Sequence, residues 1–133
     1  MTHADVSELT LVDRIEITEL LSRYSWAFDS RDGDAYVGVF TDDGELQGPT
    51  TTISGKESLR SWANDYPREP SKHFNTNVVI DGDGLVAHVS SYLVVIRLEE
   101  SGLRPILMGS YEDVVHKTPN GWRINHRKLI IDR

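Results

Sequence analysis

Hydrophobic residues recur at three- and four-residue steps in the first third of the chain and alternate with polar residues later on. The helical spacing begins at Leu11 and predicts one helix that ends near Asp29. Its apolar face is formed by Ile17, Leu20, Leu21, Tyr24 and Phe28. Thr10 and Asp13 are expected to cap its start. The turn-forming residues SRDGD are expected to end it.

Two further helices are predicted before residue 70. Asp34 is expected to cap the first of them, and TDDG at residues 41–44 is expected to form a turn. Ser54 and Glu57 have the spacing of a capping box at the start of the second helix. The apolar face of that helix is formed by Leu59, Trp62, Ala63 and Tyr66.

The pattern changes to strands after Pro70. Four segments are rich in Val, Ile, Leu and Tyr, and they cover residues 72–80, 85–98, 105–117 and 122–131. The sequences DGDG, EESG and TPNG separate them as hairpin turns. GELQ and TTIS, around residues 44–54, are candidates for two short edge strands. Helices followed by antiparallel strands predict a single α+β domain over residues 1–133, with helices on one face of a curved sheet.

Segment 85–98 is apolar on both of its alternating faces, so both faces are expected to be buried. One face would contact the helices, and the other is expected to contact a second subunit. His88 in this segment is expected to be a core or interface residue. We therefore expect a homo-oligomer.

Composition narrows the classes of function. The chain of 133 residues has no cysteine, which excludes disulfides and thiolate nucleophiles, and its five histidines lack metal-ligand spacing. We therefore expect no cofactor and no metal. The formal net charge of −7 argues against a nucleic-acid partner or an anionic membrane surface. No apolar run approaches the roughly 20 residues of a membrane span, and MTHADVSELT lacks the features of a signal peptide, so a cytoplasmic location is expected.

Polar residues on the predicted strands suggest a pocket wall. His73 shares a strand side with Asn75 and Asn77, which suits hydrogen bonding inside a pocket, the alternative being a solvent-facing hairpin edge. By alternation Arg127 shares its strand face with Arg123 and Asn125. Arg127 is therefore either a group that binds an anion or one partner of a surface ion pair.

Three stretches of the chain resemble one known family. RYSWAFDSRD, KHFNTNVVIDGDG and YEDVVHKTPNGWRINHRK are similar to the SnoaL-like branch of the nuclear transport factor 2-like superfamily, in order and over nearly the whole chain. The resemblance implies a cone-shaped α+β barrel that encloses one deep apolar pocket. Members include scytalone dehydratase, bile-acid 7α-dehydratase, hexachlorocyclohexane dehydrochlorinase, polyketide cyclases and the non-catalytic β subunits of ring-hydroxylating dioxygenases. The resemblance is therefore specific for the fold and leaves the reaction open.

The resemblance also implies roles for individual residues. Asp29 and His73 match the aspartate and the catalytic histidine of the dehydratases and the dehydrochlorinase. Arg127 resembles an arginine that helps to bind the leaving group, and Tyr24 resembles a helix tyrosine of the bile-acid enzyme. Phe28 and Asn75 are expected to contribute to the substrate-binding wall, as are Tyr24 and Arg127. The residues alone leave an alternative for each of two positions. Asp29 could be a solvated carboxylate in the turn after the helix, and Tyr24 could be a core tyrosine.

The expected function is that of a cofactor-free lyase or isomerase of the dehydratase, dehydrochlorinase or cyclase type. His73 would abstract a proton from a small apolar molecule, such as a cyclic or polycyclic one, and Asp29 would orient the imidazole at a distance of about 2.6–3.2 Å. The alternative is a non-catalytic binding or structural protein that resembles the dioxygenase β subunits. Relatives are trimers or dimers, so a trimer is expected ahead of a dimer.

Overall fold

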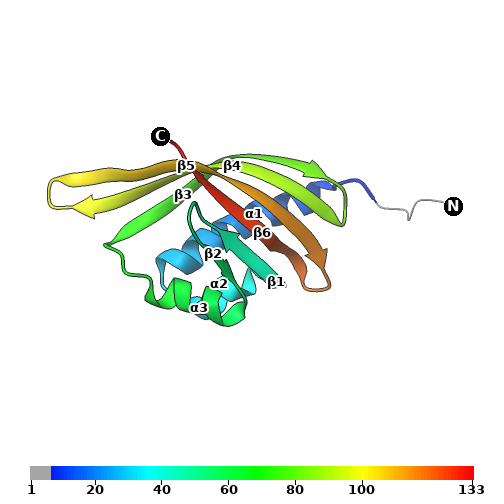
Figure 1. Ribbon diagram of the computed structural model, residues 1–133. Helices are drawn as coiled ribbons and strands as arrows, with labels where there is room; N and C mark the ends of the chain where they lie inside the picture. Colours follow the sequence, from blue (N-terminus) through cyan, green and yellow to red (C-terminus); the bar gives the residue numbers. More distant parts are fainter. Residues whose placement is uncertain (1–6) are drawn as a thin grey trace.

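Residues 7–133, which the computed structural model describes, form three helices and one six-stranded sheet (Figure 1). The helices are α1 (Leu11–Asp29), α2 (Gly33–Gly38) and α3 (Lys56–Asp65). The strands are β1 (Phe40–Gln47), β2 (Thr52–Ser54), β3 (Ser71–Gly82), β4 (Val86–Glu99), β5 (Gly102–Thr118) and β6 (Gly121–Ile131). The helices lie on one side of the curved sheet, and the β4–β5 hairpin extends beyond them (Figure 1). Within this part of the chain, no helix combines the length and the hydrophobicity needed to cross a bilayer.

The sheet is mixed and does not close into a barrel. Its strand order is β2-β1-β6-β5-β4-β3, which leaves β2 and β3 at the edges. The four predicted strands are confirmed as β3 to β6, which pair as antiparallel hairpins. The two short strands are confirmed as β1 and β2, but β1 pairs with β6 in parallel, with Leu46 opposite Arg127. The predicted α+β layout of helices on a curved sheet is therefore confirmed.

The predicted start and end of α1 are confirmed. The Thr10 hydroxyl accepts a hydrogen bond from the Asp13 backbone N–H at 3.0 Å, and the Asp13 carboxylate accepts one from the Thr10 backbone N–H at 3.0 Å. Together these bonds form a capping box that satisfies two free N–H groups of the first turn. The face predicted to be apolar is buried in the core.

The caps of the two shorter helices differ from the prediction. Asp32, not Asp34, caps α2 by accepting a hydrogen bond from the Ala35 backbone N–H at 3.0 Å. Helix α3 follows Gly55, whose φ of 88° favours glycine, and it has no side-chain cap. The Ser54 hydroxyl donates instead to Glu45 at 2.8 Å, so the predicted capping box is wrong.

Residues 41–44 do not form the predicted turn, because they belong to β1. Their local preference for a turn is expressed as an irregularity in the register between β1 and β6. The Asn125 side chain of β6 stabilises this irregularity by donating to Thr41 at 3.1 Å and to Asp43 at 3.0 Å. Pairing with β6 therefore overrides the local turn signal.

Aromatic side chains fill the concave side of the sheet. The Tyr24 ring lies 4.9 Å from the Tyr36 ring and 5.9 Å from the Tyr111 ring, measured between centroids. Phe28 and Phe40 extend this cluster, and all five side chains are buried. Burial raises the pKa of Tyr24, Tyr36 and Tyr111, so their hydroxyls stay protonated. The interior of the cone is a packed core.

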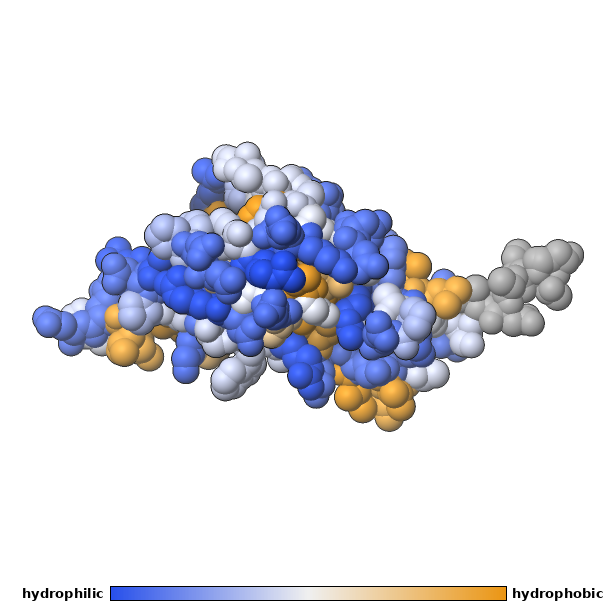
Figure 2. Space-filling model, turned by 90° about the horizontal axis from the view of Figure 1, so that it is seen from below, coloured by the Kyte–Doolittle hydropathy of each residue, from blue (hydrophilic) through white to orange (hydrophobic). Residues whose placement is uncertain are grey.

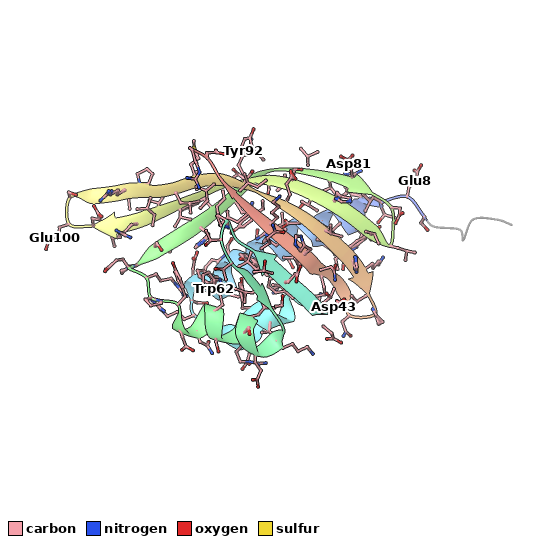
Figure 3. All side chains as sticks on the ribbon, in the orientation of Figure 1. Glu8, Asp43, Trp62, Asp81, Tyr92 and Glu100 are labelled. Carbon is pink, nitrogen blue, oxygen red and sulfur yellow. The ribbon has the colours of Figure 1, made fainter. Side chains whose placement is uncertain are left out.

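The convex face of the sheet carries apolar side chains that no helix covers. Tyr92 points away from the helices (Figure 3) and is 60% exposed, while the neighbouring Leu93 is 1% exposed. Met108 and Ile130 are also exposed, as is His88. The inward face of segment 85–98 is buried against the core as predicted, and burial of its outward face by a second subunit stays a prediction. The helical side is mainly hydrophilic, with small hydrophobic areas at its edges and near its centre (Figure 2).

We expect a second copy of the chain to cover this convex face, because monomers rarely leave a large contiguous apolar patch in water. Light scattering at micromolar concentration should then show a dimer or a trimer, and Tyr92→Lys should shift the particle toward a monomer. Trp26→Lys is a matched control, because Trp26 is 77% exposed on α1. A particle of 15.0 kDa for the unmodified chain would contradict this expectation.

Asp13 joins the start of α1 to the last hairpin, so its loss should destabilise the fold. Its carboxylate is 2% exposed and accepts hydrogen bonds from Trp122 Nε1 and Lys117 Nζ, both at 3.0 Å. The Thr10 backbone N–H, then Trp122 and Lys117, hold the pKa of Asp13 well below its usual range. Asp13→Ala should lower the free energy of unfolding by about 1–3 kcal/mol at neutral pH, because it leaves the buried Trp122 N–H without an acceptor.

Low pH should reduce the difference in the free energy of unfolding between the unmodified protein and Asp13→Ala. A lowered pKa means that the unfolded chain takes up the proton first, so the charge-dependent stability is present above about pH 4 and is lost as the pH falls further. Urea denaturation at several pH values should show the deficit of Asp13→Ala shrinking below about pH 4. Glu16→Ala, an exposed change in the same helix turn, serves as the control. A deficit that grows on acidification would contradict the assignment.

Candidate functional site

Asp29 and His73 meet where the end of α1 contacts the edge strand β3. Asp29 is the last residue of α1, and its Oδ1 lies 2.7 Å from His73 Nδ1. The other carboxylate oxygen, Oδ2, accepts a hydrogen bond from the His73 backbone N–H at 2.9 Å. One carboxylate therefore holds both the ring and the backbone of His73. The predicted contact between these side chains is confirmed.

The second ring nitrogen of His73 is not engaged by Asp29. Phe28 packs against the imidazole in an edge-to-face arrangement, with ring centroids 5.2 Å apart. The side chains of His73 and Asp29 are 15% and 16% exposed, so the pair is partly shielded from water. His73 Nε2 has no hydrogen-bond partner among residues 7–133. A ring held at Nδ1 and open at Nε2 has the geometry of a general base.

A groove of about 500 Å³ borders this pair, and we refer to it as the dyad groove. Ser25 and Trp26 of α1 line one wall, and Lys72, Phe74 and Asn75 of β3 line the other. The Ser25 hydroxyl is buried and has no hydrogen-bond partner within the described part of the chain. The groove therefore combines two large aromatic side chains with several polar groups, which is typical of a small-molecule site.

A second groove of about 530 Å³ adjoins the first, and we refer to it as the cationic groove. Asp29, Lys72 and Phe74 line both grooves. The cationic groove adds Arg31, which follows α1, and Arg68, which lies between α3 and β3. The two grooves therefore share a wall next to the Asp29–His73 pair.

Asn75 is the predicted substrate-binding residue that lines the dyad groove. Its Nδ2 donates to Ser91 Oγ at 2.8 Å and to the Tyr92 carbonyl at 2.9 Å. Its Oδ1 accepts a hydrogen bond from Arg127 at 3.1 Å. Asn75 therefore connects the groove wall to the polar centre of the core.

The predicted residues Tyr24 and Phe28 lie deeper, in the core. The Tyr24 hydroxyl accepts a hydrogen bond from the Tyr36 hydroxyl at 2.9 Å, and Tyr24 lines neither groove. Phe28 lies behind His73 and packs against its ring. Phe28 therefore positions the histidine, whereas Tyr24 contributes to the aromatic core.

Arg127 is fully buried and forms an ion pair inside the cone. Its Nε and Nη2 donate to the two oxygens of Asp113 at 2.8 and 2.9 Å. Its guanidinium lies 3.6 Å from the Tyr111 ring centroid and 4.3 Å from that of Tyr24. Burial raises the pKa of the Asp113 carboxyl, and the Arg127 guanidinium opposes that shift. The structure places Arg127 behind Asn75, outside the lining of both grooves.

A β-bulge in β6 explains why Arg127 points into the core whereas Arg123 and Asn125 do not. Ile124 pairs with Val115 and His126 pairs with Val114, so Asn125 is an extra residue in β6. The inward residues of β6 are therefore Trp122, Ile124 and Arg127, and the shared face predicted by simple alternation is wrong.

Lys72, Ser25, Arg31 and Arg68 are site residues that the sequence did not reveal. Trp26 is 77% exposed on α1, and the groove beside it has no sequence signal. Arg31 and Arg68 come together only because α1 ends beside the segment that follows α3. Within residues 7–133, His, Asp and Glu side chains form no group of three or more that could hold a metal ion.

Comparisons with known proteins agree with this fold. A SnoaL-like domain family model matches residues 9–128. One similar structure is that of Rv3472, a protein of unknown function from Mycobacterium tuberculosis, with 31% sequence identity and a TM-score of 0.86. The match covers 92% of this chain and 73% of the Rv3472 chain. A protein of unknown function with a cystatin-like fold from Nostoc punctiforme is 31% identical, with a TM-score of 0.84 and coverage of 94% and 95%.

A putative scytalone dehydratase from Novosphingobium aromaticivorans is 24% identical, with a TM-score of 0.77, and covers 92% of this chain and 86% of its own. At this identity the likeness shows the fold alone. The family match extends over nearly the whole chain and agrees with the cone-shaped arrangement of helices and curved sheet. The protein therefore belongs to the SnoaL-like domain family.

Proposed function

We propose that this protein is a cofactor-free lyase or isomerase in which His73 abstracts a proton from a small molecule bound in the dyad groove. The observation that carries this proposal is the 2.7 Å contact between Asp29 Oδ1 and His73 Nδ1, with Nε2 left without a partner in the described chain. Asp29 acts as the positioning residue, and His73 is the catalytic base.

The geometry supports a defined path for the proton. Because Asp29 accepts a hydrogen bond at Nδ1, the neutral ring carries its proton there and presents the lone pair of Nε2 to the ligand. When Nε2 takes the substrate proton, the carboxylate stabilises the imidazolium that forms. The backbone N–H of His73 donates to the same carboxylate at 2.9 Å and fixes its orientation.

The name of one structural neighbour fits the same class of chemistry. One structure with this fold is that of a putative scytalone dehydratase. Dehydration removes a proton and a hydroxyl group from neighbouring atoms, so it needs a base such as the one that His73 would supply. The substrate would decide whether this proton abstraction leads to an elimination or to an isomerisation.

Deuterium exchange tests the proposal without a known substrate. In D2O, a panel of cyclic ketones and hydroxyketones with activated C–H bonds should exchange with the unmodified protein, with NMR as the readout. His73→Ala should lower the rate by about 10²–10⁴-fold, the usual contribution of a general base. His88→Ala is the matched control, because His88 is exposed on the convex face. Equal rates for the unmodified protein and His73→Ala would overturn the proposal.

The packed interior supports a second candidate, a binding or structural protein without catalysis. Five aromatic side chains and the Arg127–Asp113 pair fill the cone where the family is expected to hold a deep pocket. Such a protein would bind compounds in the dyad groove, and it would exchange no deuterium. Binding without exchange across the panel therefore favours this second candidate.

A further inference from the structure

Two arginines converge beside the dyad on a single carbonyl oxygen. Arg31 Nη1 donates to the Tyr66 carbonyl at 3.1 Å, and Arg68 Nη1 donates to the same oxygen at 3.0 Å. Arg31 Nη2 also donates to the Arg68 carbonyl at 3.1 Å. Arg31 has a φ of 56°, in the left-handed region that residues with a side chain seldom adopt. The two guanidinium groups are therefore held next to each other.

These cations have no acidic partner. Arg31, Arg68 and Lys72 form no ion pair with a carboxylate within residues 7–133. Burial, and then the neighbouring charge of Arg31, lower the pKa of Arg68. Glu69 and Asp29 also line the cationic groove, but Asp29 is engaged by His73. In a chain with a net charge of −7, a groove that gathers three cations is a local exception that an anion would stabilise.

The cationic groove is physically linked to the dyad. The Arg68 guanidinium lies 4.0 Å from the centroid of the Phe28 ring, and His73 packs on the same ring at 5.2 Å. Lys72 lines both grooves from the position just before His73 on β3. A ligand whose reactive carbon lies at His73 can therefore place a second group among the three cations.

Apolar side chains of the β4–β5 hairpin line another part of the cationic groove. Ile96 and Leu98 of β4 and Leu103 of β5 line it, on the hairpin that extends beyond the helices (Figure 1). Leu98 is 65% exposed and Leu103 is 72% exposed, so both are accessible to a ligand. Cations beside exposed apolar side chains are complementary to a molecule with an anionic group and an apolar body.

We propose that the dyad acts on an anionic amphiphile, whose carboxylate or phosphate group binds to Arg31, Arg68 and Lys72 while its apolar body contacts the neighbouring leucines. This rests on the proposed function, since it names the substrate class of the same site. It also assigns Lys72 as a specificity-determining residue.

A pair of fluorescent probes tests the anion site directly. Anilinonaphthalene sulfonate has an apolar ring system and one anionic group, and N-phenyl-1-naphthylamine has the same rings without the charge. The sulfonate should bind about tenfold more tightly, since each partly exposed charge pair contributes a small factor. Lys72→Glu should weaken sulfonate binding about tenfold and leave the neutral probe within twofold. Lys56→Glu, the same change at a lysine that pairs with Asp42, should leave both unchanged.

Competition identifies the anion. Octanoate or octyl phosphate should displace the sulfonate probe, and the stronger competitor shows whether the natural group is a carboxylate or a phosphate. Octanol should displace it at least several-fold less well. Equal displacement by octanol, equal binding of the two probes, or equal effects of Lys72→Glu and Lys56→Glu would each overturn the proposal.

The variant His73→Ala separates this proposal from the proposed function. It should bind the sulfonate probe like the unmodified protein, because the anion site does not use His73. Loss of the Lys72 effect while exchange still depends on His73 would overturn the anion site and leave the function intact. The reverse pattern, a Lys72 effect without any exchange, would leave an anion-binding site and remove its catalytic role.

Discussion

Asp113→Ala should destabilise the protein by about 3–5 kcal/mol, because it leaves the Arg127 charge buried without a counter-ion. Both side chains of this pair are fully buried, and Asp113 provides two of the three hydrogen bonds that Arg127 donates to side chains. The remaining acceptor is Asn75, which is neutral. Guanidinium denaturation followed by tryptophan fluorescence should show the loss as a lower midpoint with a similar slope.

A double replacement separates the buried charge from the lost volume. Asp113→Leu combined with Arg127→Met removes both charges and keeps an apolar side chain at each position. It should recover most of the stability, because well-packed apolar groups often replace a buried pair at little cost. A loss below about 1 kcal/mol for Asp113→Ala would show that the cation does not depend on Asp113 for its burial.

Asp29→Asn should lower the exchange rate by about 10²–10⁴-fold while keeping the fold. The asparagine Oδ1 can still accept the His73 backbone N–H, which Asp29 Oδ2 now accepts at 2.9 Å. Its Nδ2 would then donate to His73 Nδ1, which requires the ring proton to move to Nε2. The ring would present an N–H to the substrate where a lone pair is needed, and it would lose the charge that stabilises the imidazolium.

The rate of exchange as a function of pH provides the readout for this positioning role. A base with an altered tautomer should change the shape of the dependence of the exchange rate on pH. A merely structural change would lower the rate by the same factor at every pH. Asp34→Asn is the matched control, because Asp34 is exposed and pairs with Arg60 at 2.8 Å. Full activity of Asp29→Asn at every pH would contradict the role of Asp29.

Local signals determined much of the fold. The capping box of Thr10 and Asp13 and the three- and four-residue spacing of apolar residues define α1, because both act within a few residues along the chain. Turn sequences and alternation define β3 to β6 for the same reason. The family resemblance supplied the pair of Asp29 and His73, which lie 44 positions apart and share no local pattern.

Where local signals compete with pairing across the sheet, only the tertiary structure decided the outcome. The turn signal at residues 41–44 yields to the parallel pairing of β1 with β6, and the Ser54 hydroxyl bonds to Glu45 instead of capping α3. One extra residue in β6, Asn125, reverses the alternation and turns Arg127 into the core. Such features depend on partners far along the chain, which a periodic pattern does not specify.

The site divides in the same way. The sequence by itself determined that the chain forms helices on a curved sheet, and its resemblance to a family predicted that Asp29 and His73 meet. The grooves beside the pair, the packed interior and the convergence of Arg31 and Arg68 on Tyr66 were decided by the tertiary structure. The reason is physical: a groove and a cluster of cations exist only between elements, so their residues carry no shared period in the sequence.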